Sequence, residues 1–274
     1  MATLGARYPG AALITGASAG LGEAFARRCA SEGMDLVLVA RRKERLEAVA
    51  EMLERDHGVK VLVIAKDLSE PDAPAAIKQA CDEASVTVSM LVNNAGFGTY
   101  SAFHETDPLQ QLALVDVNCR TPVALANYFL PGMVARKNGA VIFVASTAAY
   151  QPCPQIAVYG ATKSFNLMLG EALWTELKPH GVDALALSPG YTKTEFHRVA
   201  RVNRLPSDEL FREPSEVVAT CFDALGRQPS VIDRVTPFDA RLKRIKNKLF
   251  NLKRYLRTAA SAGLLHLADL IAVV

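Results

Sequence analysis

The 274-residue sequence lacks the features that mark several large classes of protein. No stretch reaches the ~18 uninterrupted apolar residues that a membrane-spanning helix needs. The first residues carry no apolar run flanked by basic residues, so we expect no signal peptide. The chain also has no long Gly/Ser/Pro linker and no internal repeat, which argues against a string of modules or a solenoid.

Cysteine and histidine are too few and too scattered to build a metal or disulfide scaffold. Five cysteines occur, far apart and without a C-x-x-C pair: Cys29, Cys81, Cys119, Cys153 and Cys221. This pattern predicts reduced thiols in a cytoplasmic protein. The five histidines form no group with the spacing of metal ligands, so we expect no metal site.

The composition is typical of a globular protein. Apolar residues make up 50% of the chain and charged residues 22%, which allows a sizeable core and excludes general disorder. A mass of 29.6 kDa suits one large α/β domain, or at most two small ones. The net charge of +3 is too weak to imply a nucleic-acid partner. The charge is uneven, however, because residues 239–274 hold eight Lys or Arg against two Asp, a net charge of +6.

Short apolar runs alternate along the chain with longer stretches of helical spacing. The runs are rich in Val, Ile and Leu, as in strands buried on both faces of a parallel sheet. They are Ala11–Thr15, Asp35–Ala40, Val59–Ala65, Ser89–Asn93, Ala140–Ser146 and Val182–Ser188, with a further short strand near Val231–Val235. The helical stretches are Leu21–Glu32, Arg42–His57, Ala73–Ala84, Leu109–Arg136, Val158–Lys178 and Pro214–Leu225. This order predicts an α/β fold, a doubly wound parallel sheet of the Rossmann type, in a single domain spanning residues 1–238.

Two segments fall outside this alternation. Tyr191–Glu213 is a long, charged connection, and connections of that length in a compact domain are usually lids or binding loops, so we expect it to bind substrate. Residues 239–274 are predicted to form a basic, amphipathic helical extension, with Leu and Ile spaced three and four apart. Such a helix packs on its own domain or a sister subunit, or makes peripheral contact with a membrane surface; the pattern leaves these alternatives open.

A glycine-rich turn follows the first strand and opens a helix. Gly16, Gly20 and Gly22 allow a tight bend and a close approach of the backbone to a pyrophosphate. Ser18, Ala19 and Leu21 complete the turn, and the helix N-terminus offers free N–H groups to the anion. The turn therefore predicts a dinucleotide site, although its G-x-x-x-G-x-G spacing departs from G-x-G-x-x-G.

The end of the second strand determines which dinucleotide fits. A site that prefers NAD usually carries Asp or Glu there, to bind the ribose hydroxyls. This sequence has Arg41 and Arg42 instead, and two guanidinium groups can pair with a 2′-phosphate. NADP(H) is therefore the predicted coenzyme, ahead of NAD(H); the alternative is that both arginines merely begin a solvated helix.

Three more motifs follow in order along the chain. Asn93-Asn94-Ala95-Gly96 follows the fourth strand, Tyr159-Gly160-Ala161-Thr162-Lys163 opens a helix, and Pro189-Gly190 follows the sixth strand. Together with the glycine-rich turn they resemble the short-chain dehydrogenase/reductase family, in its shorter, single-domain group. The resemblance covers roughly residues 11–225 and implies a homodimer or homotetramer, because relatives are oligomers.

The predicted catalytic residues also make sense as chemistry. Tyr159 and Lys163 are four residues apart, so their side chains share one face of a helix. A nearby ammonium favours the phenolate and should lower the tyrosine pKa, which makes the pair a tuned acid/base. Ser146, placed at the end of the fifth strand, is expected to hydrogen-bond a substrate carbonyl.

The family resemblance implies roles for further residues. Asn118, within the long predicted helix, matches an asparagine that holds a water linking the catalytic lysine to solvent. Asn93 supports the coenzyme site, Asp67 and Leu68 contact the adenine, Lys163 also bonds the nicotinamide ribose, and Thr192 bonds the carboxamide. The full predicted coenzyme set is Gly16, Ser18, Ala19, Gly20, Leu21, Gly22, Arg41, Arg42, Asp67, Leu68, Asn94, Ala95, Gly96, Tyr159, Lys163, Pro189, Gly190 and Thr192.

These observations predict an NADP(H)-dependent oxidoreductase that transfers a hydride between nicotinamide and a carbonyl/alcohol pair. A mainly apolar substrate, such as a ketone, a β-ketoacyl chain or a steroid, would suit the side chains expected around the site. Those side chains are Phe97, Tyr100, Tyr150, Pro152, Ile156 and Phe196. The alternatives are an NAD-linked epimerase or dehydratase of the same superfamily, and a catalytically silent dinucleotide sensor or scaffold.

Overall fold

The computed structural model describes residues 2–200, 202, 207 and 210–233. Their centre is a seven-stranded sheet with the strand order β3-β2-β1-β4-β5-β6-β7, and every pairing in it is parallel. The strands are β1 (Ala11–Thr15), β2 (Asp35–Ala40), β3 (Val61–Ala65), β4 (Val88–Asn93), β5 (Gly139–Val144), β6 (Val182–Ser188) and β7 (Ser230–Ile232). The predicted doubly wound, Rossmann-type sheet in a single domain is confirmed.

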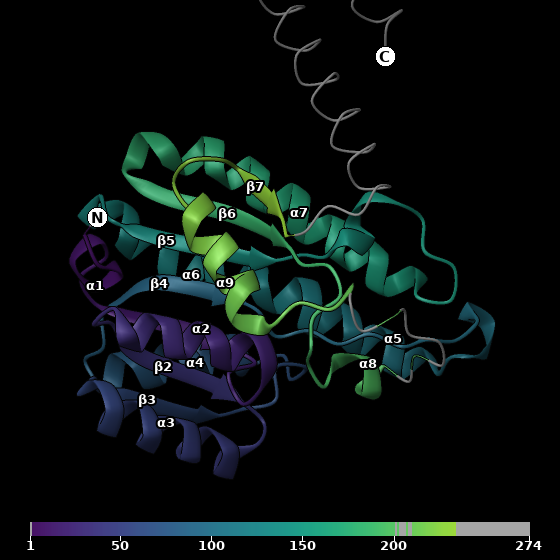
Figure 1. Cartoon of the computed structure of the whole chain (residues 1–274), viewed down its shortest axis with the longest axis horizontal. Helices are drawn as coiled ribbons and strands as arrows, with labels where there is room; N and C mark the ends of the chain where they lie inside the picture. Colours follow the sequence, from purple (N-terminus) through teal and green to yellow (C-terminus); the bar gives the residue numbers. More distant parts are fainter. Residues whose placement is uncertain (1, 201, 203–206, 208–209, 234–274) are drawn as a thin grey trace, which may run out of the picture. The chain divides into compact units, whose positions relative to one another are not determined.

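Helices cover both faces of the sheet (Figure 1). They are α1 (Leu4–Arg7), α2 (Gly20–Ser31), α3 (Lys43–His57), α4 (Ala73–Glu83), α5 (Pro108–Val115), α6 (Thr121–Arg136), α7 (Ala157–Leu177), α8 (Phe196–Val199) and α9 (Pro214–Ala224). Phe25 of α2, Leu46 of α3 and Val217 of α9 pack on one face with Ile14 of β1. The other face buries apolar residues of α4, α6 and α7 against Leu13. Alternate residues of β1 thus enter two separate cores, which is why the strand is apolar throughout.

The sheet positions the site through its topology. Chain order runs outward from β1 to β3 on one side and from β4 to β7 on the other, so the direction of winding reverses between β1 and β4. In sheets of this kind the helices before and after the reversal lie on opposite faces, and a crevice opens at the carboxyl ends of the two central strands. Thr15 ends β1 and Asn93 ends β4, so the glycine-rich turn and the Asn-Asn-Ala-Gly segment meet there.

The structure corrects two details of the predicted elements. The predicted helix Leu109–Arg136 is α5 and α6 joined by a π-helical turn, Asp116–Arg120. The predicted strand Ala140–Ser146 ends at Val144, and Ser146 begins a 3₁₀ turn, Thr147–Tyr150, whose Ala148 N–H donates to the Ser146 hydroxyl at 3.1 Å. Ser146 lies outside the strand because its hydroxyl accepts a hydrogen bond from a nearby backbone N–H, which competes with the hydrogen bonds between strands.

The predicted basic extension, residues 239–274, lies outside the described residues, as does the boundary expected at residue 238. Within the described residues, no helix is both long enough and apolar enough to cross a membrane. The five cysteines, all of which are described, are free thiols.

Candidate active site

At its three glycines, Gly16, Gly20 and Gly22, the glycine-rich turn is packed too closely to admit a side chain. Gly16 and Gly20 have φ values of +70° and +61°, a region that glycine enters without strain. A Cβ on Gly22 would lie 2.2 Å from the Gly16 carbonyl oxygen, because α2 begins directly against the turn. The sequence therefore needs glycine here to bring the backbone and the first N–H groups of α2 to the edge of the sheet.

The ends of β1 and β4 are tied together beside this turn. The Thr15 hydroxyl accepts hydrogen bonds from the backbone N–H groups of Asn94 and Ala95, each at 3.0 Å. The Asn94 side-chain amide donates to the Thr15 carbonyl at 2.8 Å. Asn93 is buried, and within the described residues neither atom of its amide has a hydrogen-bond partner. Buried amides normally find partners, so an unsatisfied one at this edge is consistent with a ligand site.

The two arginines after β2 occupy different environments. Arg41 is 74% exposed, and its guanidinium lies 3.8 Å from the Asp67 carboxylate. Arg42 instead donates to the Ser18 hydroxyl of the glycine-rich turn, through Nε at 3.3 Å and Nη2 at 3.1 Å. Its Nη1 donates to the Glu195 carboxylate at 2.8 Å, and Arg45 donates to the same carboxylate at 3.2 Å. Arg42 and Arg45 therefore already hold an anion, and the Ser18 hydroxyl orients Arg42 by accepting two of its hydrogen bonds.

Tyr159 and Lys163 lie one turn apart near the start of α7. The Lys163 ammonium is 5.7 Å from the centroid of the Tyr159 ring and donates to the Val144 carbonyl, at the end of β5, at 2.7 Å. Only 4% of Lys163 is exposed. The Ser146 hydroxyl lies close enough to the Tyr159 phenol to lower the pKa of that phenol. The three predicted catalytic side chains thus meet at the carboxyl end of β5.

The pKa of Tyr159 departs from the sequence-based expectation. Burial raises this pKa to about 12, while the neighbouring Ser146 side chain acts in the opposite direction. Burial also lowers the pKa of Lys163 to about 8. The expectation of a lowered phenol pKa is therefore wrong, because burial of Tyr159 is the largest influence and raises this pKa. At neutral pH the phenol keeps its proton, as a proton donor must.

Asn118 lies in the π-helical turn and is fully buried. Its side-chain amide donates to the Phe97 carbonyl and to the Thr162 hydroxyl, both at 3.0 Å, and accepts from the Phe97 N–H at 3.2 Å. The side chain therefore fixes the segment after β4 against α7. π turns widen a helix locally and are frequent at functional sites. A Cβ on Gly96 would lie 3.0 Å from the Asn118 side-chain oxygen and 3.2 Å from the Lys163 ammonium, so these three residues meet at one point.

The remaining predicted residues lie at the same edge of the sheet. Asp67, two residues beyond β3, accepts from the Ser69 N–H and hydroxyl, and the carbonyl of buried Leu68 accepts from Thr121. Beyond β6, the Pro189 carbonyl accepts from the Thr147 N–H at 3.0 Å. The buried Thr192 hydroxyl donates to the Gly190 carbonyl at 3.1 Å.

The described part of the predicted binding loop, Tyr191–Glu213, makes contacts at the site that the sequence did not predict. The rings of Phe196 and Tyr159 are 5.2 Å apart between centroids, and a Cβ on Gly98 would lie 3.1 Å from the Tyr159 ring. Phe196 was expected near the substrate, but neither its stacking on Tyr159 nor the pairing of Glu195 with Arg42 has a signal in the local sequence. Both depend on how a distant loop folds back.

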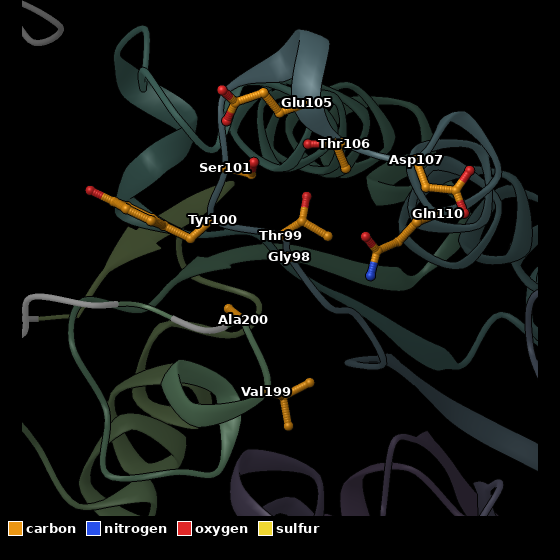
Figure 2. Close-up of a pocket in the computed structure, with 10 residues that line it drawn as sticks. All are labelled: Gly98, Thr99, Tyr100, Ser101, Glu105, Thr106, Asp107, Gln110, Val199 and Ala200. Atoms are coloured by element: carbon orange, nitrogen blue, oxygen red, sulfur yellow. The ribbon is translucent and has the colours of Figure 1, made fainter.

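A pocket of about 250 Å³ lies beside this loop (Figure 2). Its walls come from the segment after β4, the start of α5, and α8. They are Gly98, Thr99, Tyr100, Ser101, Glu105, Thr106, Asp107, Gln110, Val199 and Ala200. Thr99 and Gln110 lie on one side, and Val199 and Ala200 lie across from them (Figure 2). The lining is more polar than the apolar pocket expected from the sequence, because the segment after β4 contributes hydroxyl and carboxylate groups.

Comparison with known proteins agrees with this geometry. The model of the short chain dehydrogenase family matches residues 10–204, most of the described chain. The chain belongs to the short-chain dehydrogenase family. A short-chain dehydrogenase from Sphingobium yanoikuyae, solved in complex with NADPH, superposes with a TM-score of 0.80 at 32% identity. That superposition covers 89% of this chain and 95% of the other.

Two curated members of the family are similar over most of this chain. Hydroxysteroid dehydrogenase-like protein 1 of Gallus gallus is 32% identical over 225 residues, which is 80% of this chain and 66% of the relative. A very-long-chain 3-oxoacyl-CoA reductase of Phaeosphaeria nodorum is 31% identical over 222 residues, 79% of this chain and 63% of the relative. This short-chain dehydrogenase therefore spans just under two thirds of the length of these two relatives.

Proposed function

We propose that this short-chain dehydrogenase is an NADP(H)-dependent carbonyl reductase. The observation that carries the proposal is the meeting of a protonated phenol, a serine hydroxyl and a buried ammonium beside a glycine-rich turn. The Lys163 ammonium lies 5.7 Å from the ring centroid of Tyr159, and the Ser146 hydroxyl lies close enough to lower the pKa of its phenol. A site built only to sense a dinucleotide has no need of a proton donor at this place.

The residues present fit a phosphorylated dinucleotide. The turn from Gly16 to Gly22 leaves the backbone bare where a pyrophosphate would approach, and the N-terminus of α2 lies behind it. Arg42 and Arg45 would hold the 2′-phosphate, since they already bind a carboxylate, and Ser18 orients the Arg42 guanidinium. The exposed guanidinium of Arg41 would add positive charge at the edge of this phosphate site. The NADPH complex of the Sphingobium relative supports the same choice of coenzyme.

When bound, NADPH supplies the hydride that reduces the carbonyl carbon. The Tyr159 phenol donates its proton to the carbonyl oxygen, which becomes the hydroxyl of the alcohol. The Ser146 hydroxyl hydrogen-bonds the same oxygen and stabilises its developing negative charge. Lys163 keeps a positive charge close to the phenolate that remains. Its contact with Val144, together with the packing of Asn118 on the segment after β4, fixes these groups in place.

The proposed substrate is a bulky, mainly apolar ketone, of the 3-oxoacyl or steroid type. The aromatic ring of Phe196 lies against Tyr159, and Tyr191, His197 and Phe211 extend this aromatic cluster along the loop. The names of the chicken and fungal relatives support the same classes of substrate. The polar pocket beside Gly98 would accept the more hydrated part of such a molecule.

The deciding experiment follows NADPH and NADH consumption spectrophotometrically with apolar ketones, β-ketoesters and 3-ketosteroids. We expect turnover with at least one class and faster turnover with NADPH. Coenzyme binding without turnover of any ketone would favour the sensor instead. Consumption of a nucleotide-sugar without net change in coenzyme would favour the epimerase.

The reductase should lose activity in mild alkali. Since burial lowers the pKa of Lys163 to about 8, its ammonium is charged below that pH and becomes neutral above it. The pKa of Tyr159, about 12, is too high to limit proton donation in this range. We therefore expect kcat/KM for reduction, which reports groups of the free enzyme, to be level from pH 6 to 7 and to fall about tenfold for each pH unit well above 8. A rate that stays level to pH 10 would show that the charge on Lys163 is not required.

We infer a homo-oligomer from an exposed apolar face. Leu109, Leu112 and Val115 lie three residues apart on α5, and they are 74%, 60% and 40% exposed. On α7, which contacts α5, Phe165 and Met168 are 41% and 56% exposed. Apolar residues gathered on neighbouring helices are typical of contacts between subunits.

Leu112→Glu should therefore reduce the assembly state measured by sedimentation velocity, because it places a charge in that contact. Leu112→Met keeps the face apolar and is the matched control, for which no change is expected. An unchanged sedimentation coefficient for the glutamate variant would place the subunit contact elsewhere.

A further inference from the structure

The carboxylate of Glu195 is held at the proposed 2′-phosphate site. It accepts from Arg42 at 2.8 Å and from Arg45 at 3.2 Å, both reaching it from the segment after β2. Arg198, three residues further along the loop, also donates to it at 3.2 Å. The hydrogen bonds from Arg42 and Arg45 hold the pKa of Glu195 at about 2, so this carboxylate carries a full negative charge at neutral pH.

The segment that carries Glu195 joins the coenzyme turn to the catalytic phenol. The side chain of Thr194 lies against the turn, since a Cβ on Gly20 would be 3.0 Å from the Thr194 methyl group. The ring of Phe196, two residues later, packs against that of Tyr159, with the centroids 5.2 Å apart and the planes tilted by 46°. Glu195, between them, is thus anchored over the site rather than free in solvent.

Two anions cannot both use the same donors on Arg42. Its Nε and Nη2 are engaged with Ser18, and its Nη1 is engaged with Glu195. A 2′-phosphate would need the donors now given to the carboxylate, and it would bring two negative charges close to a third. A nucleotide without the 2′-phosphate has no such conflict.

We propose that Glu195 is a coenzyme-specificity residue that competes with the 2′-phosphate for Arg42 and Arg45. This inference rests on the proposed function, because it takes the same arginines as the phosphate site. Glu195 lowers the affinity for NADP(H) relative to NAD(H). Binding of the phosphorylated nucleotide displaces the carboxylate and thereby loosens the segment that carries Phe196 over Tyr159.

The test uses two nucleotides that differ only in the 2′-phosphate, 2′,5′-ADP and 5′-AMP, titrated calorimetrically into the full chain at low ionic strength. In Glu195→Gln we expect 2′,5′-ADP to bind about 3- to 10-fold more tightly, and 5′-AMP to change by less than about twofold. Glu47→Gln removes one charge from α3, where Glu47 pairs with Lys43, and is the matched control. It should leave the ratio of the two affinities unchanged. Arg42→Ala should weaken 2′,5′-ADP selectively.

Hydrogen exchange of residues 195–200 gives a second measurement. In the wild type, 2′,5′-ADP should speed exchange in this segment, and 5′-AMP should not. An unchanged affinity ratio in Glu195→Gln, or weaker binding of 2′,5′-ADP, would overturn the proposal, the latter because Glu195 would then be orienting Arg42 for the phosphate. A wild-type chain that binds neither nucleotide would instead overturn the proposed function, and this inference with it.

Discussion

Replacing Tyr159 with phenylalanine is expected to lower kcat for ketone reduction by about 100-fold or more while leaving the affinity for NADPH within about threefold. The variant loses only the hydroxyl that donates the proton. The ring remains, so the stacking with Phe196 at 5.2 Å and the packing against Gly98 are preserved. In the proposed site the coenzyme would be held mainly by the glycine-rich turn and Arg42, which the substitution does not touch.

Stopped-flow reduction of the best ketone and fluorescence titration of NADPH measure the two quantities separately. Tyr128→Phe removes an exposed phenol hydroxyl from α6, at a residue outside the predicted site, and should match the wild type. If Tyr159→Phe keeps more than about a tenth of the wild-type rate, another group delivers the proton and the proposed mechanism fails.

The sheet was largely predictable because its strands are buried on both faces. Asp35–Ala40 and Val182–Ser188 are found with the predicted bounds, since continuous apolar runs of this length are typical of strands buried in a parallel sheet. The site was predictable where it depends on local spacing. Tyr159 and Lys163, four apart on α7, share a face by helix geometry alone.

Features that depend on tertiary environment were not predictable. The chemistry of a tyrosine–lysine pair predicts a lowered phenol pKa, yet burial, which no local pattern encodes, raises it to about 12. The π turn at Asp116–Arg120 interrupts a continuous helical pattern. Its place in the site follows from the hydrogen bonds of Asn118 with Phe97 and Thr162, which are distant in sequence. Glu195 meets Arg42 across 153 residues, so the pairing follows only from the path of the loop.

The substitution with the largest expected effect on the coenzyme site itself is Gly22→Ala. The new Cβ would lie 2.2 Å from the Gly16 carbonyl oxygen and 2.8 Å from the Asn94 amide nitrogen, and both belong to the clamped junction of β1 and β4. The backbone must shift to relieve this overlap, because no flexible side-chain end is available to yield. We expect a loss of about 2–4 kcal/mol in the free energy of unfolding and at least a tenfold weaker affinity for NADPH.

Gly132→Ala provides the matched comparison, since it makes the same change inside α6. There the new Cβ would lie 3.1 Å from a guanidinium nitrogen of Arg136, the far end of a flexible side chain. The helix gains from alanine, so the free energy of unfolding should change by less than about 1 kcal/mol and NADPH binding should be unaffected. Urea denaturation followed by circular dichroism, together with NADPH titration, measures both variants. If Gly22→Ala unfolds at the same urea concentration as Gly132→Ala and still binds NADPH, the turn has room for a side chain. The proposal that the pyrophosphate needs glycine at this turn would then be wrong. Coenzyme binding would depend on Arg42 and its neighbours alone.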